Sequence, residues 1–349
     1  MYKRQILGYY NKRIILISLI LESNVAKLNL NYKVERCNMK AYDINSKRHI
    51  LEELIDNALL DSVKWVANRC TSQKPQEPDY MSALSTKFVK DLFNVLVAVF
   101  PYYDFSVLGV YCHQKPIVDI KQAKKTELGD ILFVYADRKL KGEIVLNSLL
   151  LQAKVSSDPC LRVHQSERHQ LELYKNWPQF TYCRAGNLNG KKRNILPKTI
   201  NDGAQYLLID DNSFTNGLYF RKGMFPMGCA IPDDILCINN SLSSELIDLL
   251  KLKSGRTFDS NPHTTEDEWS KMIWDLLKIS TLKYSKRKNA QLKSFSRINE
   301  CSHFCTEGMR DMTLLDEALG NYINIEDISD ENSGVSVVLI ESRLRSEKV

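Results

Sequence analysis

The stretch TELGDILFVYADRKLKGEIVLNSLLLQAKVSS, residues 126–157, decides the fold of this chain. It contains two apolar runs, Asp130–Ala136 and Ile144–Val155, whose β-branched, aromatic and leucine residues predict two β-strands. The connection DRKLKGE between them is short and polar, which suits a hairpin. The stretch therefore predicts two neighbouring antiparallel strands that are largely buried.

Three polar residues lie at one end of this hairpin, where buried strands would not be expected to carry them. Asp130 opens the first strand, and Gln152 and Lys154 end the second. A hairpin brings these two ends together, and residues two apart in a strand share a face, so we expect the three polar groups to converge. Taken singly, Asp130 and Lys154 have plainer explanations. Aspartate after Gly129 is a common turn residue, and lysine protects edge strands from aggregation.

A converging carboxylate, amide and ammonium group suits phosphodiester hydrolysis. Asp130 would ligate Mg²⁺, a hard cation that prefers oxygen ligands. Lys154 would orient or help to deprotonate the attacking water and offset charge on the phosphate, while the metal would stabilise the developing oxyanion.

The elements around the hairpin can be predicted from apolar spacing and from glycine and proline positions. Apolar residues three and four apart predict two helices upstream, and a further helix and strand follow the hairpin. In chain order the expected elements are a helix over residues 46–70, a helix at Met81–Phe100, a strand at Phe105–Cys112, the hairpin, a helix ended by Pro178 and a strand at Ala204–Asp211. This order predicts an α/β fold with a mixed β-sheet flanked by helices.

The pattern of GD, an apolar run, a turn, a second apolar run and QAK resembles the PD-(D/E)xK, or restriction-endonuclease-like, nuclease superfamily. The resemblance covers residues 81 to about 211, with Gln152 in place of the usual Asp or Glu. It implies a restriction-endonuclease-like core, Mg²⁺ or Mn²⁺ as cofactor, and Asp130, Gln152 and Lys154 as catalytic residues. It also implies that the metal is held by Asp130, Gln152 and the main-chain carbonyl of Ala153.

The helix after the hairpin is similar to one branch of this superfamily. Gln170 and Tyr174 lie four residues apart, on one face of that helix, as in the Gln-xxx-Tyr motif of RecB-type exonucleases. The resemblance implies that this motif lies beside the metal site and touches DNA.

Gln152 departs from the superfamily pattern, because it removes one of two acidic ligands. Either another acid substitutes, with Asp91, Glu52 or Glu53 on the upstream helices as candidates, or metal binding is poor. Variants with glutamine here occur among members considered active, so the change is not taken as loss of function.

We expect three regions along the chain. Residues 1–38 form an uncertain N-terminal segment; its opening, MYKRQ, resembles a translated sequencing adapter and Met39 is a second candidate start, so we expect part of it to be non-native. Residues 39–225 form the nuclease-like domain with its N-terminal helices. Residues 226–349 form a mainly helical region of unknown role, with a last strand expected in VSVVLIES.

Composition sets broad limits on partners and location. The chain has 349 residues, 44% of them hydrophobic, a net charge of +6 and nine cysteines without repeated spacing. These cysteines argue against a disulfide framework and favour a reducing, cytoplasmic compartment. The mild positive charge is compatible with a polyanionic partner. The apolar run IILISLIL is far below the ~20 residues that span a bilayer, so no membrane is expected.

Three functions from different classes follow. The first is a metal-dependent nuclease acting on DNA. The resemblance to the superfamily suggests that it serves as an effector of a bacterial phage-defence system. The second is a nuclease-fold protein that binds nucleic acid without cutting it. The third is an interaction scaffold in which the polar residues are incidental. The protein partners that we expect are a second copy of the chain or a protein of the same defence system.

Overall fold

The computed structural model describes residues 41–70, 74–112, 116–120, 125–139, 142–198, 203–210, 225–285, 304–308 and 334–345. The chain divides into two compact units, Met1–Arg48 and His49–Val349. The expected N-terminal segment, residues 1–38, lies outside the described residues.

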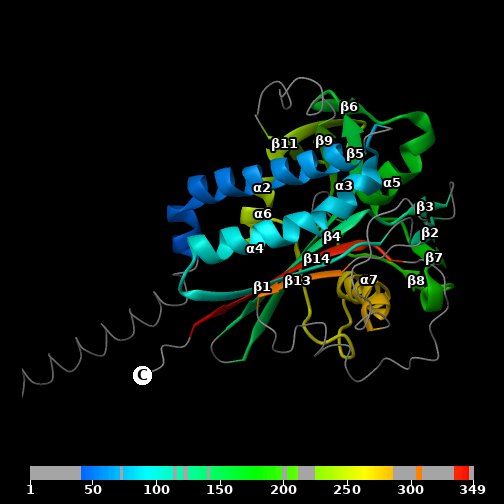
Figure 1. The fold of residues 1–349 in the computed structure, drawn as a ribbon. Helices are drawn as coiled ribbons and strands as arrows, with labels where there is room; N and C mark the ends of the chain where they lie inside the picture. The colour runs from blue at the N-terminus through cyan, green and yellow to red at the C-terminus, as the bar shows by residue number, and fades with distance from the viewer. Residues whose placement is uncertain are drawn as a thin grey trace, which may run out of the picture. The chain divides into compact units, whose positions relative to one another are not determined.

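Ten strands of the described residues form one large mixed sheet (Figure 1). Their order across the sheet is β13-β1-β14-β4-β5-β9-β10-β11-β6, with β12 also paired to β5. The strands are β1 (Tyr103–Val110), β4 (Ile131–Arg138), β5 (Ile144–Ser156), β6 (Cys160–Arg162), β9 (Ala204–Asp210), β10 (Met227–Ala230), β11 (Ile235–Ser241), β12 (Arg256–Phe258), β13 (Phe304–Gly308) and β14 (Ser336–Leu344). The predicted α/β class with a mixed sheet flanked by helices is therefore confirmed.

The predicted hairpin forms the centre of this sheet. β4 and β5 are antiparallel neighbours, and β9 then pairs parallel to β5. Nearly every residue of β4 is buried, as the continuous apolar run indicated.

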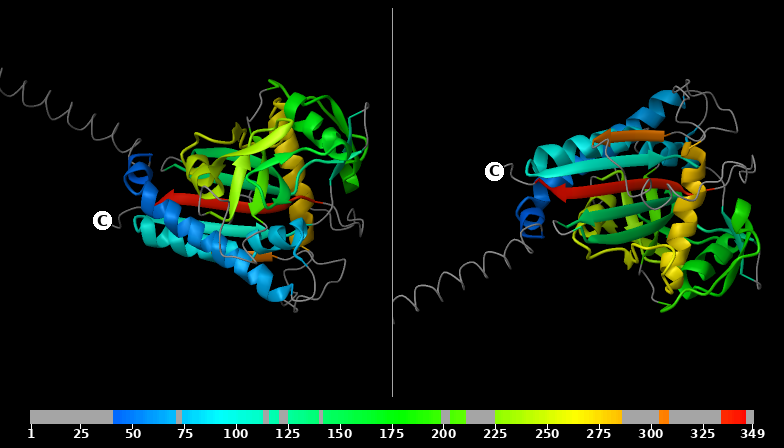
Figure 2. Two further views of the ribbon diagram at one scale, coloured as in Figure 1. Left: turned by 90° about the horizontal axis from the view of Figure 1, so that it is seen from above. Right: turned by 90° about the horizontal axis from the view of Figure 1, so that it is seen from below.

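The expected boundary near residue 225 does not divide the sheet. β14 lies between β1 and β4, antiparallel to the first and parallel to the second, and Figure 2 shows it in red between them. Strands β10 to β13 also follow residue 225. The region predicted to be mainly helical therefore completes the sheet of the region before it.

Helices cover both faces of the sheet. They are α2 (Arg48–Arg69), α3 (Glu77–Leu84), α4 (Lys87–Val99), α5 (Arg168–Asn176), α6 (Leu242–Leu250) and α7 (Glu268–Ser285). In Figure 1, α2 and α4 lie above β1 and β14, and α7 lies below β14. Even-numbered residues of β1, such as Leu108, share a core with α7. On the opposite face, a Cβ on Gly109 would lie 1.9 Å from the carbonyl oxygen of Ser85, so only glycine permits this close approach.

The single helix predicted at Met81–Phe100 is two helices. Ser85 and Thr86, at the break, donate their hydroxyls to the carbonyls of Met81 and Ser82 at 2.8 and 2.7 Å. Such side-chain bonds compete with the helical ladder. The break gives α3 its own direction and its own N-terminus.

A second, four-stranded sheet lies beside α5. Its order is β3-β2-β7-β8, formed by β2 (Ile117–Asp119), β3 (Thr126–Glu127), β7 (Phe180–Arg184) and β8 (Lys192–Arg193). No helix among the described residues is long and apolar enough to cross a membrane.

Candidate active site

The predicted polar residues meet where β5 runs past the start of β4. Ile131, the first residue of β4, lies opposite Leu151, whereas β5 continues well beyond that point. The N–H of Asp130 donates to the carbonyl of Leu151 at 3.0 Å, so odd-numbered residues of β5 turn their main-chain groups toward β4. Beyond Leu151, β4 has no residue left to accept the N–H groups of Ala153 and Val155. Acidic side chains take its place.

Asp130 occupies the first of these positions. Its Oδ2 accepts the N–H of Ala153 at 2.7 Å and also an N–H of Gln152 Nε2. The carbonyl of Ala153 points to the same side of β5, because both main-chain groups of a residue face one neighbour in an antiparallel ladder. Gln152 is 3% exposed, and its Oε1 has no hydrogen-bond partner among the described residues. The structure thus brings Asp130, Gln152 and Ala153 together.

Lys154 lies on the same face of β5 as Gln152 and is 9% exposed. Its Nζ donates to Glu167 Oε1 at 2.8 Å. Glu167 is the last residue of the 3₁₀ turn η1 (Gln165–Glu167), none of whose residues is buried. The ammonium group acts electrostatically on Asp130, and it has a carboxylate partner, Glu167, that the sequence does not indicate.

Two further acidic residues border the site. Glu77 is the first residue of α3, and the main-chain N–H of Val155 donates to its carboxylate. Glu127 ends β3, shortly before Asp130. Burial raises the pKa of both carboxyls above its usual value, and the ammonium of Lys154 offsets part of that rise. Four carboxyls, counting Glu167, thus surround one buried lysine.

The ionisation of Asp130 is unfavourable in this setting. Burial is the largest cause and raises its pKa to about 7; repulsion from Glu127 and Glu77 adds to the rise, while the N–H of Ala153 and the charge of Lys154 oppose it. Crowded, desolvated carboxyls are stabilised when a cation binds between them. The electrostatics of the site therefore favour a bound cation.

Tyr174 fixes the turn that carries Asp130. Its hydroxyl donates to the carbonyl of Leu128 at 2.9 Å, and the ring stacks on Trp177. A Cβ on Gly129 would lie 2.9 Å from the Tyr174 hydroxyl and 2.7 Å from Leu150, so the turn approaches α5 closely. Tyr174 is 2% exposed. The resemblance implies that Tyr174 touches DNA. In the structure its side chain is buried, and it supports the turn that carries Asp130.

Gln170 lies one helical turn before Tyr174 on α5 and is half-buried. Its Oε1 is buried without a hydrogen-bond partner among the described residues. The structure thus leaves one polar atom of Gln170 unsatisfied beside Tyr174, and the supporting role of Gln170 stays a prediction.

The acids suggested as substitutes for the missing ligand lie elsewhere. Asp91 forms an ion pair with Lys87 along α4. Glu52 acts electrostatically on Asp56 within α2, and Glu53 is exposed on the same helix. None of the three is among the charges that act on Asp130.

The sequence held partial signals for the acids that do border the site. Glu77 lies in the polar, proline-containing break after α2, at a helix start where acids are favoured by the helix dipole. Glu127 precedes Asp130 by one short turn. Glu167 carries no local signal, because its approach to Lys154 depends on the path of the chain through β6.

The donor chemistry of the site fits a hard divalent cation. In the part of the chain that the structure describes, no three His, Cys, Asp or Glu side chains are arranged to hold a metal ion. The groups that meet are instead one carboxylate, one amide and one main-chain carbonyl, all of them oxygen donors of the kind that Mg²⁺ accepts together with several waters. The unpartnered Oε1 of Gln152 is consistent with such a ligand.

Comparisons of the chain with models of protein families, with curated proteins and with solved structures found no match.

Proposed function

We propose that the chain is a Mg²⁺- or Mn²⁺-dependent nuclease of PD-(D/E)xK type that hydrolyses phosphodiester bonds in DNA. The convergence of Asp130, Gln152, Ala153 and Lys154 beyond the start of β4 carries the proposal. An edge-protecting role does not fit Lys154, since it is buried and pairs across to Leu208 of β9.

Glu77 and Glu127 supply the negative charge that Gln152 lacks. Both carboxyls interact electrostatically with Asp130 and with Lys154. A divalent cation bound by Asp130, the Ala153 carbonyl and Gln152 Oε1 would polarise the phosphate and activate water. The carboxylates would balance its charge, so the missing acidic ligand does not leave the site neutral.

Lys154 provides the proton-handling and anion-binding group. An ammonium has three donors, and Glu167 accepts from it. The remaining donors can orient the attacking water and neutralise charge on a phosphate oxygen. The hydroxyl of Tyr174 keeps the Asp130 turn in place while this happens.

Gln152 favours one alternative, a nucleic-acid-binding protein that does not cut. In the structure its Nε2 donates to Asp130, and this bond stabilises the carboxylate without a metal. A chain that keeps this arrangement would bind nucleic acid in EDTA and release it uncut in Mg²⁺.

The test is incubation of the purified protein with linear DNA, circular DNA and RNA in Mg²⁺, Mn²⁺ or EDTA. Asp130→Asn and Lys154→Ala should each reduce cleavage about a hundredfold or more, as expected when a charged catalytic group is lost. Asp137→Asn and Lys139→Ala, a charge pair at the far end of the same hairpin, serve as matched controls and should cut normally. Cleavage that survives both site substitutions would overturn the proposal, and binding without cleavage would favour the alternative.

A further inference from the structure

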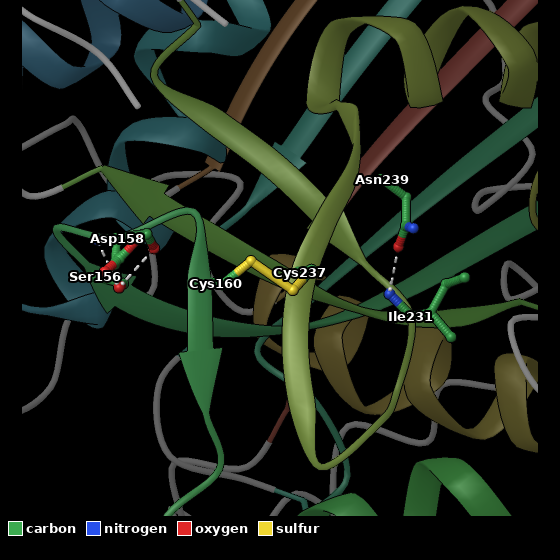
Figure 3. Close-up of a disulfide and its surroundings, with 6 residues drawn as sticks. All are labelled: Ser156, Asp158, Cys160, Ile231, Cys237 and Asn239. Carbon is green, nitrogen blue, oxygen red and sulfur yellow. Dashed lines mark hydrogen bonds between the residues drawn. A yellow bond between two sulfur atoms is a disulfide. The ribbon is translucent and has the colours of Figure 1, made fainter. Parts of the chain in front are cut away.

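Two cysteines on neighbouring strands form a disulfide, and one of them follows Lys154 by six positions in the chain. Cys160 of β6 lies opposite Cys237 of β11 in an antiparallel pair, and their sulfur atoms are bonded (Figure 3). They lie 77 positions apart in the chain, and the sequence gave no signal for this pairing. The sequence argued against a disulfide framework, and the structure forms one disulfide among the described residues, at this pair.

The bond is accessible, unlike two of the free cysteines that the structure describes. Cys160 and Cys237 are both exposed, whereas Cys112 and Cys229 are buried. Thiol–disulfide exchange requires that a thiolate reach one of the sulfurs. This cystine meets that requirement in the folded protein.

The disulfide fastens the segment that leads into η1 and α5. The turn before β6 is closed by Ser156, whose hydroxyl donates to the carbonyl of Asp158 at 2.8 Å, and the turn before β11 by the N–H of Ile231, which donates to Asn239 Oδ1 at 3.0 Å (Figure 3). Both ends of the bond are thus held by local structure.

Other ties also join this segment to the β10–β11 hairpin. β6 pairs with β11 over Cys160–Arg162, and the N–H of Ile238 donates to the carbonyl of Pro159 at 3.0 Å. The N–H of Val163 donates to the carbonyl of Asp234 at 3.0 Å. Arg168 and Lys175 form ion pairs with Asp234 and Asp233 at 3.9 and 2.8 Å, and exposed pairs of this kind contribute little. β6 itself is only three residues long. The covalent bond thus adds one link to a segment that main-chain hydrogen bonds and the packing of Leu161 and Val163 against the core also hold.

The part of the segment that depends most on this restraint carries Glu167. α5 is anchored in the core by its buried Leu171, Leu173 and Tyr174, but η1 has no buried residue. Loosening β6 therefore affects Glu167, the partner of Lys154, before it affects Tyr174.

We propose that Cys160–Cys237 is a thiol–disulfide exchange site whose reduction loosens the segment from β6 to η1 and lowers the activity of the Lys154 site. The effect on activity rests on the proposed nuclease function; the exchange itself does not. Disulfides that form in reducing compartments are usually transient or redox-sensing, which fits an exposed bond in a chain expected to be cytoplasmic.

The reaction partner is a small or protein dithiol. Its thiolate attacks one cysteine sulfur, forms a mixed disulfide and releases the other cysteine as a thiolate, which takes a proton from water. The second thiol of the reductant then displaces the remaining cysteine and becomes oxidised to a disulfide. The protein gains two electrons and two protons, and a disulfide oxidant reverses the reaction.

The first measurement does not depend on catalysis. The full chain, purified without reductant, is titrated in mixtures of reduced and oxidised dithiothreitol, trapped with an alkylating agent and analysed by mass spectrometry. Cys160 and Cys237 should become alkylated together and reversibly under native conditions. Alkylation of both in the absence of reductant, or a bond reduced only after denaturation, would overturn the exchange site.

The second measurement follows η1 and the site. Reduction should increase hydrogen exchange at residues 160–168, with little change at Leu173 and Tyr174, and should lower kcat/KM for DNA about threefold to tenfold, as loss of preorganisation does. The double variant Cys160→Ser/Cys237→Ser should be insensitive to reductant, and Cys183→Ser should respond like the wild type. Unchanged exchange at residues 160–168 would overturn the coupling. Absence of cleavage in every redox state, with the exchange response intact, would count against the nuclease function alone.

Discussion

Gln152 is the residue that distinguishes the two proposed functions, an active nuclease and a nucleic-acid-binding protein that does not cut. Its Nε2 donates to Asp130 while its Oε1 lacks a partner among the described residues. Gln152→Glu should tighten Mn²⁺ binding about tenfold, which corresponds to ~1.4 kcal/mol, because it adds a carboxylate beside the cation. Calorimetric titration with Mn²⁺ measures this directly.

The same substitution should destabilise the metal-free protein by about 1–2 kcal/mol, since it places a like charge beside Asp130. Gln165→Glu, which adds the same charge at an exposed position of η1, is the control and should change neither quantity. Weaker Mn²⁺ binding by the Gln152 variant would show that the amide is not near the cation.

The pKa of Asp130 gives a pH dependence with a definite sign. Its folded-state pKa of about 7 lies above its ordinary value of 3.8. Below the ordinary value the carboxyl is neutral in both states, and stability is lost as the pH rises through about 7, because ionisation is then unfavourable only in the folded protein. Asp130→Asn removes this loss.

In EDTA, the variant should gain about 3 kcal/mol of unfolding free energy relative to the wild type between pH 5 and pH 8, at about 1.4 kcal/mol for each pH unit up to pH 7. Urea unfolding at the two pH values measures it, and the difference between the proteins cancels the contributions of ionisable groups that do not interact with Asp130. A difference that does not change with pH would mean that Asp130 ionises normally.

At the level of elements, α5 supports the turn before β4. Tyr174→Phe removes the hydrogen bond to the Leu128 carbonyl and should cost about 1 kcal/mol of stability. It should also lower kcat several-fold, with DNA binding in EDTA unchanged, because the ring is covered. Tyr102→Phe, at a tyrosine that is 74% exposed, is the matched control. Loss of DNA affinity in the Tyr174 variant would instead favour a direct contact.

The hairpin, both upstream helical regions and the polar cluster could be predicted from the sequence. Their signals are local, since alternation, apolar spacing and turn residues all act within a few positions of Asp130 and Lys154. The break between α3 and α4 was missed, because Ser85 and Thr86 act through side-chain bonds that apolar spacing does not register. That break is what places Glu77 in the site.

At the level of the whole molecule, β14 could be predicted as a strand but not as the neighbour of β4. Its apolar run fits any buried position, and the pairing joins residues about 200 positions apart. Such pairing depends on the completed fold rather than on local pattern. The same holds for Glu167 and for the Cys160–Cys237 bond.

The position of β14 predicts that the C-terminal region is needed for folding. A fragment of residues 39–333 would leave β1 and β4 without their shared neighbour and should lack a cooperative urea transition, whereas residues 39–345 should unfold cooperatively. Circular dichroism during urea titration compares the two. A cooperative transition in the shorter fragment would show that β14 is dispensable.

The most direct test of the central claim is the rate of DNA cleavage as a function of Mg²⁺ concentration, for the wild type and for Asp130→Asn. The site described here predicts saturable cleavage by the wild type, abolished in EDTA, with a loss of about a hundredfold or more in the variant. Equal rates in the two proteins, or cleavage that persists in EDTA, would contradict it.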